Sequence, residues 1–433
     1  MKNKFRAHLF LLSVACLAVA LPIPSEAENP PESPALPQKD DGGGNWDALL
    51  AKAQAGDSRA QTLLGIRYGQ GNGVKQDYEK AVEWIMKAAQ QGDAEAQYSL
   101  GSCYAQGKGV PVNMEKAFEW TRKSALQGFA PAQFNLGLLY YNKREESGNA
   151  QKALEWWTKS AQQGNADAQH VLGTMYANGT HVAQDYEKAV EWLKKSASQG
   201  FADAQVALGH CYLDGKGVGQ DYGKAVEWYK KAVEQGFADA QVALGSCYYY
   251  GIGVEQNYEE AVKLYLPALT QNNAMAMFNL ALCMIEGKGI TKNDELAFQS
   301  LEKAAERGHV EAKSLLGNFY AAGLVVAKNE QKALELWEET AQQGISNSLF
   351  RLGCLYYDGK ILPHDPGKAL ELWIEAAKKE NPVAQLTLGR LDLKGVIMPV
   401  KLEQIMQWLE QTAEKGNEDA REILQWLKKR HSL

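Results

Sequence analysis

Small and apolar residues recur along most of the chain with a period of 36 residues. In each period the pattern Ala-x-x-x-Leu-Gly-x-x-Tyr, as at Ala60, Leu64, Gly65 and Tyr68, places such residues at i, i+4, i+5 and i+8. Those positions share one face of an α-helix. A second series of alanines keeps the same period and marks the apolar face of a second helix. The pattern therefore predicts ten consecutive helix pairs over residues 57–416.

Start and stop signals separate the predicted helices. In the first period Gly71 and Gly73 follow the first helix, and glycine accepts the positive φ that ends a helix. The second helix begins at Asp77, and nine of the ten periods have Asp or Asn at the equivalent position, where the side chain can cap free N–H groups. The third period has Asn149 at the cap but Lys-Arg-Glu-Glu at residues 143–146 in place of the glycine loop. This substitution predicts an extension of its first helix.

A glycine also stands inside the first helix of nine of the ten periods, as at Gly65. Glycine in a helix costs about 1 kcal/mol relative to alanine. We therefore expect this glycine to allow close approach of the neighbouring helix.

Half-periods flank the array. Residues 45–56 align with the end of a second helix and predict an N-terminal capping helix, and residues 417–433 predict a C-terminal one. Repeat arrays need such terminal elements with a polar outer face for solubility. Residues 28–44 contain four prolines and then three glycines, which is the composition of a linker.

Residues 1–27 have the pattern of a signal peptide. Three basic residues precede an apolar run, residues 9–21, which is short for a membrane span of about 20 residues. Small residues would permit cleavage after Ala27 or after Ala20; lipidation at Cys16 and an uncleaved anchor are the alternatives. We expect an exported protein, periplasmic rather than secreted or surface-bound, with no transmembrane segment after cleavage.

Composition narrows the class of protein. The chain has 433 residues, of which 45% are apolar and 23% charged, as in ordinary globular proteins. The net charge is −6, or −8 without residues 1–27, whereas nucleic-acid-binding proteins are usually basic, so we expect no nucleic-acid partner. Six cysteines are too few for a disulfide scaffold. We expect a monomer.

The sequence contains no recognisable catalytic motif. It contains no Cys-x-x-Cys or His-Glu-x-x-His motif, no phosphate-binding loop and no Gly-x-Ser-x-Gly motif. The cysteines of the repeats precede or adjoin the tyrosine position of first helices, which favours small buried thiols. His170 and His210 lie on adjacent first helices, but a catalytic or metal site would need a third oriented group. We therefore expect no enzyme, no cofactor and no metal site.

The repeat pattern resembles the Sel1-like repeat family, a branch of the tetratricopeptide-like helical repeats, over residues 45–433. The resemblance implies an all-α fold, a right-handed α/α superhelical solenoid of ten 36-residue helix pairs with the first helices on its concave side. It also implies a role as adaptor or scaffold in protein assembly, often in the periplasm or outside the cell. The residues that carry it, with their equivalents one period apart, are Ala96, Leu100, Gly101, Tyr104, Gly107, Gly109, Val110, Ala117 and Trp120.

The resemblance also indicates where a partner would bind. It places the first-helix positions three before, one after and four after the glycine on the concave side, and the next position is mostly polar. Aromatic anchors beside amide and acid groups suit an extended peptide or a partner helix. The alternative is that the aromatic residues only fill space between repeats. The predicted groove residues are Tyr98, Phe134, Tyr141, Asn142, His170, Asn178, His210, Asp214, Tyr249, Phe278, Phe350, Tyr357 and Asp358.

The sequence thus favours an exported scaffold that holds a peptide or helix of a protein partner in its concave groove. Two alternatives remain open. The chain would be a structural subunit that binds cell-wall polymer or polysaccharide if the aromatic row stacks on sugars. It would be a hydrolase acting on a cell-wall-derived substrate if a residue such as His210 were catalytic.

Overall fold

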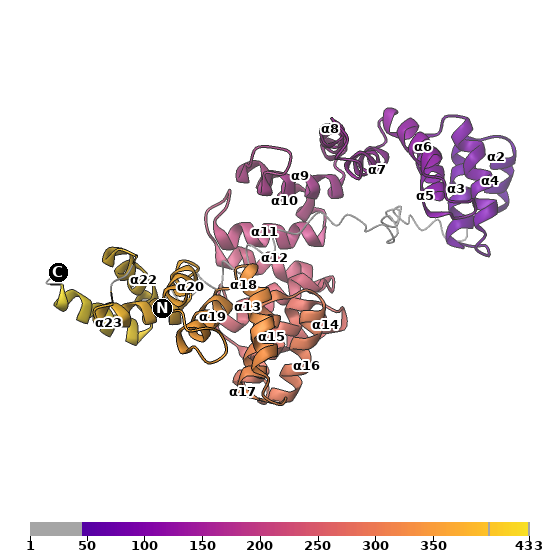
Figure 1. Ribbon diagram of the computed structural model, residues 1–433. Coiled ribbons are helices and arrows are strands. Elements are labelled where there is room, and N and C mark those ends of the chain that lie inside the picture. Colours follow the sequence, from indigo (N-terminus) through magenta and orange to yellow (C-terminus); the bar gives the residue numbers. More distant parts are fainter. Residues whose placement is uncertain (1–45, 397–398, 432–433) are drawn as a thin grey trace. The chain divides into compact units, whose positions relative to one another are not determined.

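The computed structural model describes residues 46–396 and 399–431. Within these ranges it contains 22 helices, α2 to α23, and every regular element drawn in Figure 1 is a helix. The predicted signal peptide and linker lie outside the described residues. None of the helices in the described ranges combines the length and the apolar character that crossing a membrane requires.

The helices alternate as first and second members of 36-residue pairs, which confirms the predicted all-α repeat solenoid. The first helices are α3 (Ser58–Gln70), α5 (Ala94–Gln106), α7 (Ala130–Tyr141), α9 (Ala166–Asn178), α11 (Ala202–Asp214), α13 (Ala238–Tyr250), α15 (Ala274–Glu286), α17 (Val310–Ala322), α19 (Ser346–Asp358) and α21 (Pro382–Leu393). The second helices are α4 (Tyr78–Gln90), α6 (Met114–Leu126), α8 (Asn149–Gln162), α10 (Tyr186–Ser198), α12 (Tyr222–Glu234), α14 (Tyr258–Thr270), α16 (Asp294–Glu306), α18 (Glu330–Gln342), α20 (Pro366–Lys378) and α22 (Leu402–Glu414). Helices α2 (Trp46–Gln54) and α23 (Glu418–Arg430) lie within the two ranges predicted to cap the array.

The described chain divides into two compact units, residues 46–220 and residues 221–431. Within each unit a helix packs mainly against the helices that precede and follow it in the sequence. This is the contact pattern of a repeat protein, in which each repeat touches its neighbours.

The glycine inside the first helix permits the predicted close approach. At three of these glycines the neighbour is the indole ring of a tryptophan on the second helix of the same pair. A Cβ atom at Gly137, for example, would lie 2.5 Å from Cδ1 and Nε1 of Trp157. Each indole also donates a hydrogen bond of 3.2 Å to a first-helix carbonyl three residues before the glycine. The pairs are Gly137–Trp157, Gly317–Trp337 and Gly353–Trp373.

The predicted Asp and Asn caps are present at eight second helices, where the side chain accepts a hydrogen bond from the N–H three residues later. The caps are Asp77, Asn113, Asp185, Asp221, Asn257, Asn293, Asn329 and Asp365.

The predictions for the third repeat are wrong. Helix α7 ends at Tyr141 and is not extended, and Asn149 is the first residue of α8 rather than its cap. The intervening residues form consecutive turns, in which the Lys143 N–H bonds to the Tyr140 carbonyl and the Glu146 N–H to the Lys143 carbonyl. The Asn149 side chain holds these turns by donating to the Lys143 carbonyl and the Glu146 carboxylate, both at 3.0 Å.

Buried glutamines join one repeat to the next. The Gln97 amide donates to the Ala89 carbonyl of the preceding second helix at 3.1 Å and accepts from Gln127, after the following second helix, at 2.8 Å. The same arrangement recurs at the equivalent glutamines of three other repeats. The pairs are Gln61 with Gln91, Gln133 with Gln163 and Gln169 with Gln199.

Candidate functional site

Three predicted groove residues, at the position three before the glycine, pack between repeats. Each ring lies against the residue that precedes the next first helix, 31 residues later in the sequence. The ring pairs and their centroid distances are Tyr98–Phe129 at 5.5 Å, His170–Phe201 at 5.2 Å and Phe278–His309 at 4.5 Å. These contacts match the space-filling alternative for this position.

The position four after the glycine gives a second recurring contact, with the buried tryptophan of the same pair. Tyr141 lies 5.3 Å from the Trp157 ring, and Tyr357 lies 5.4 Å from the Trp373 ring. The two tyrosines differ in access, because Tyr141 is 7% exposed and Tyr357 is 47% exposed. The backbone carbonyls of two further predicted residues, Phe134 and Phe350, accept the indole N–H bonds.

Tyr249 joins two consecutive first helices in the unit of residues 221–431. Its hydroxyl donates to the Glu286 carboxylate at 2.6 Å, and the Lys288 ammonium lies 2.6 Å from the same carboxylate. Burial, and then the hydrogen bond to Glu286, raise the pKa of Tyr249. The Tyr249 hydroxyl is therefore already bonded within the protein.

The remaining predicted groove residues are mostly polar. Asp214 is half-buried and lies 3.0 Å from the Lys216 ammonium. His210 is only 1% exposed. Asn142, Asn178 and Asp358 are exposed.

The histidines and thiols have the properties of buried structural groups. Burial lowers the pKa of His170 and of His210 to about 4, so both rings are neutral at pH 7. Burial raises the pKa of the Cys103 thiol to about 11 and that of Cys211 and Cys247 to about 12. Reactive cysteines have lowered pKa values. Among the described residues, no cluster of three or more His, Cys, Asp or Glu side chains is placed to hold a metal ion.

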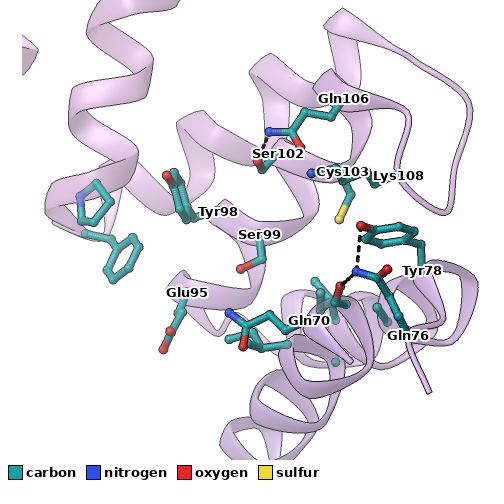
Figure 2. A pocket seen from close by; sticks show the side chains of 17 residues that line it. Gln70, Gln76, Tyr78, Glu95, Tyr98, Ser99, Ser102, Cys103, Gln106 and Lys108 are labelled. Atoms are coloured by element: carbon teal, nitrogen blue, oxygen red, sulfur yellow. Dashed lines mark hydrogen bonds between the residues drawn. The ribbon is translucent and has the colours of Figure 1, made fainter. Parts of the chain in front are cut away.

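An open cavity lies in the unit of residues 46–220, where α3 and α4 face α5 (Figure 2). Its volume is about 390 Å³, and we call it the α3–α5 pocket. One wall is a polar stripe on α5, formed by Glu95, Ser99, Ser102 and Gln106. These residues are spaced i, i+4, i+7 and i+11 and therefore share one helix face. Of the predicted groove residues, Tyr98 lines this pocket.

The opposite wall owes its hollow shape to small residues. Gly69 of α3 has no side chain, and a Cβ atom there would meet only the Cβ atom of Ala81 on α4, at 3.7 Å. Gln76, in the loop between these helices, donates to the Gly69 carbonyl at 2.7 Å and to the Tyr78 hydroxyl at 2.9 Å. These bonds fix the rim of the pocket.

Three polar side chains around the pocket lack a side-chain partner in the described part of the chain. Glu95, Ser99 and Gln70 form no side-chain hydrogen bond or ion pair with any residue that the structure describes. Burial raises the pKa of Glu95, the Asp93 carboxylate adds to this effect, and Arg59 opposes it. The pocket therefore presents a carboxyl, a hydroxyl and an amide group to a ligand.

The sequence analysis missed Glu95 and Ser99 because it considered other first-helix positions. Ser102 lies one residue after the glycine, and Gln70 and Gln106 lie five residues after it, which are positions that the analysis had included. The i, i+4, i+7, i+11 spacing of polar residues from Glu95 to Gln106 is visible in the sequence. That signal could have found the stripe, but the cavity depends on three-dimensional packing against α3 and α4.

Comparison with known proteins relates the repeats to one family. The family model of the Sel1 repeat matches nine consecutive segments: residues 58–93, 94–129, 130–165, 166–201, 202–237, 238–273, 274–309, 310–345 and 346–381. The tenth predicted repeat follows them, contains α21 and α22, and stays a prediction as a family repeat. No curated protein sequence matches this chain.

Solved structures of bacterial proteins are similar to this chain. A protective antigen from uropathogenic Escherichia coli, which displays an SLR fold, is 33% identical with a TM-score of 0.62, over 87% of this chain and 81% of that chain. A Sel1 repeat protein from Oxalobacter formigenes is 32% identical with a TM-score of 0.45, over 72% and 89% of the two chains. An immunity protein from Pseudomonas aeruginosa is 24% identical with a TM-score of 0.35, over 51% and 82%.

Proposed function

This chain belongs to the Sel1 repeat family of helical scaffold proteins, and we propose that it is an exported, non-enzymatic scaffold that binds a protein partner at the α3–α5 pocket. Sel1 repeats generally mediate protein interactions. The signal pattern of residues 1–27 supports export, with the periplasm as the expected compartment.

The observation that carries this proposal is the set of unpaired polar groups around a preformed cavity. Glu95 and Ser99 are half-buried and Gln70 is exposed, so these polar groups are open to solvent and to a ligand. Glu95, Ser99 and Gln70 line the pocket without a side-chain partner in the described part of the chain. A ligand that offers complementary groups would replace water at these side chains with direct hydrogen bonds.

The geometry favours this function over the two alternatives. Stacking along a sugar chain needs several accessible ring faces, but Tyr98, Phe134, Tyr141 and Tyr249 are each at most 9% exposed. Tyr357, at 47%, is the one exposed tyrosine of the predicted groove. Hydrolysis by the chain's own nucleophiles needs ionisable groups near neutrality, whereas burial shifts the pKa of His210 and of the buried thiols away from it.

The test is a cross-linking pull-down from an envelope extract with residues 28–433 as bait. The variant Ser99→Arg would fill the pocket without altering a buried core residue. Ser198→Arg is the matched control, because it makes the same change at an exposed position of α10 in the same unit. Circular dichroism would check that both variants are folded.

We expect one protein to be recovered by the wild type and by Ser198→Arg and to be lost with Ser99→Arg. Equal recovery by all three baits would show that the pocket is not the binding site. Recovery of wall polymer instead of protein would favour the polysaccharide-binding alternative.

A further inference from the structure

The α3–α5 pocket has opposite charges at its two ends. Glu95 lies in the first turn of α5, and Lys108 lies just beyond the end of that helix. They are the only two charged residues among those lining the pocket in the described structure. At about 1.5 Å per residue, the stripe from Glu95 to Gln106 is roughly 16 Å long.

The Glu95 end has the features of a cation site. The Tyr98 and Phe129 rings, 5.5 Å apart, also line the pocket together with Pro131, but Tyr98 is only 7% exposed. In Figure 2 the Glu95 side chain projects away from the Tyr98 ring. A carboxylate at the rim of a cavity suits a guanidinium or ammonium group, which donates charge-assisted hydrogen bonds to it. No ion-pair partner of Glu95 is present in the described part of the chain.

Comparison with equivalent loops shows why Lys108 is available at the other end. In two other repeats the equivalent lysine pairs with an acid two residues earlier: Lys216 lies 3.0 Å from Asp214, and Lys288 lies 2.6 Å from Glu286. In this repeat the acid is replaced by neutral Gln106. Among the described residues, the Lys108 ammonium contacts the Tyr78 ring, 5.9 Å from its centroid, and forms no ion pair.

The middle of the pocket can bind a peptide backbone but not a helix. Ser99, Ser102 and Gln70 supply hydroxyl and amide groups between the charged ends. A cavity of 390 Å³ is near the lower limit of about 300–1,000 Å³ for ligand pockets, whereas a helix with side chains is about 10 Å wide. An extended chain advances about 3.3 Å per residue, so about five residues cover the stripe.

We propose that the pocket binds an extended peptide segment of the partner, with a basic side chain at Glu95 and an acidic side chain near Lys108 about five residues away along the peptide. This inference rests on the proposed function and specifies the chemistry of the partner at the same site.

The test is selection from a library of capped hexapeptides on immobilised residues 28–433, with the bound peptides identified by mass spectrometry. We expect enrichment of peptides with Arg or Lys at one end and Asp or Glu at the other. The variant Glu95→Gln should reduce the basic preference about tenfold and leave the acidic one, and Lys108→Gln should do the reverse.

A charge exchange gives the sharper result. In the double variant Glu95→Lys/Lys108→Glu, the basic and acidic ends of the selected peptides should exchange places relative to the pocket. A photoreactive group at residue 99 and one labelled peptide end would report the orientation. The matched control is Glu191→Lys/Lys194→Glu, on the exposed side of α10, which should select the same peptides as the wild type.

The outcomes separate this inference from the proposed function. Enrichment without a charge preference, or a preference that the Glu95 and Lys108 variants leave unchanged, would overturn the charge assignment. A second outcome is that no hexapeptide is enriched, although the wild type captures a partner protein and Ser99→Arg does not. This result would contradict binding of an extended peptide and would still support the scaffold function. If Ser99→Arg still captured the partner protein, the pocket would not be the binding site, and both proposals would be wrong.

Discussion

At the scale of single residues, Gly137 sets how closely α7 and α8 can pack. Replacing it with alanine would improve helix propensity by about 1 kcal/mol. The added Cβ atom would, however, lie 2.5 Å from two ring atoms of Trp157, which is fully buried and cannot move aside. Overpacking of this kind costs about 1–3 kcal/mol. We expect Gly137→Ala to lower the free energy of unfolding by up to about 2 kcal/mol, measured by urea denaturation.

Gly223 is the matched control for this substitution. It lies in the first turn of α12, and a Cβ atom there would meet its nearest neighbour, the Asp221 carboxylate, at an ordinary 3.5 Å. Gly223→Ala should therefore stabilise the protein by up to about 1 kcal/mol through helix propensity alone. If both variants were stabilised, the packing explanation of the recurring glycine would be wrong.

His210 makes the stability of the protein depend on pH. Burial, with a further contribution from Lys216, lowers the pKa of the folded ring to about 4, whereas an unfolded histidine titrates near 6.5. The unfolded chain therefore binds more protons between these values, and stability is lost as the pH falls from 6.5 to 4. The loss from this ring is at most about 3 kcal/mol. His210→Gln should show a smaller drop in melting temperature between pH 7 and pH 4.5 than the wild type.

His364, which is exposed, is the control position for this experiment. The variant His364→Gln should keep the acid sensitivity of the wild type, because its imidazole ring remains in solvent in the folded protein. Identical acid sensitivity of His210→Gln and the wild type would contradict the assignment.

The residue scale is also where the site was hardest to predict. The 36-residue repeat pattern identified the first-helix positions, but it did not show which residues each side chain contacts. The Tyr98 ring packs against the Phe129 ring. That contact forms only when the next repeat packs beside this one, so the spacing of residues does not reveal it. Glu95 and Ser99 became candidates only when the cavity and the lack of internal partners were known.

At the scale of elements, the loops between paired helices need a residue with positive φ. The second loop glycine has this conformation in several repeats, as at Gly109 and Gly217, with φ of 73° and 69°. In the eighth repeat the same position is Val325, which takes a φ of 67° and is 42% exposed. A left-handed conformation costs a β-branched residue about 1–2 kcal/mol. We expect Val325→Gly to raise the melting temperature, as measured by circular dichroism.

Val112 provides the comparison for this loop substitution. It is an exposed loop residue, 63% accessible, and does not have a positive φ. Val112→Gly should leave the melting temperature unchanged or lower it, because glycine only adds freedom to the unfolded chain there. A stabilising Val112→Gly, or a destabilising Val325→Gly, would disagree with the strain argument.

The helices themselves were predicted well where local signals and the repeat agreed. Capping residues such as Asp77 set the helix starts, and loop glycines such as Gly71 set the helix ends. The prediction for the third repeat was wrong because residues 143–146 are good helix formers and carry no local stop signal. The turns there are held by the side chain of Asn149, and the sequence alone did not reveal this contact.

At the scale of the whole molecule, the stability of each repeat should depend mainly on its contacts with the neighbouring repeats. Helices pack mainly on those next to them in the sequence, and buried glutamines such as Gln133 and Gln163 link successive repeats. In such arrays stability is approximately a sum of repeat and nearest-neighbour terms. A local defect should therefore loosen the adjacent repeats first and leave distant ones unaffected.

Hydrogen exchange measured by mass spectrometry tests this distribution with paired defects. Gly137→Ala should speed amide exchange in α6 to α9, and Gly317→Ala, which meets Trp337 in the same way, should do so in α16 to α19. Each variant is the control for the other, because the chemical change and the local contact are the same. Faster exchange over the whole chain in both variants would mean that the repeats unfold as one cooperative block. Localised exchange would mean that a partner bound at the α3–α5 pocket stabilises chiefly the repeats that form it, since binding adds free energy only to the folded form of the segment it contacts.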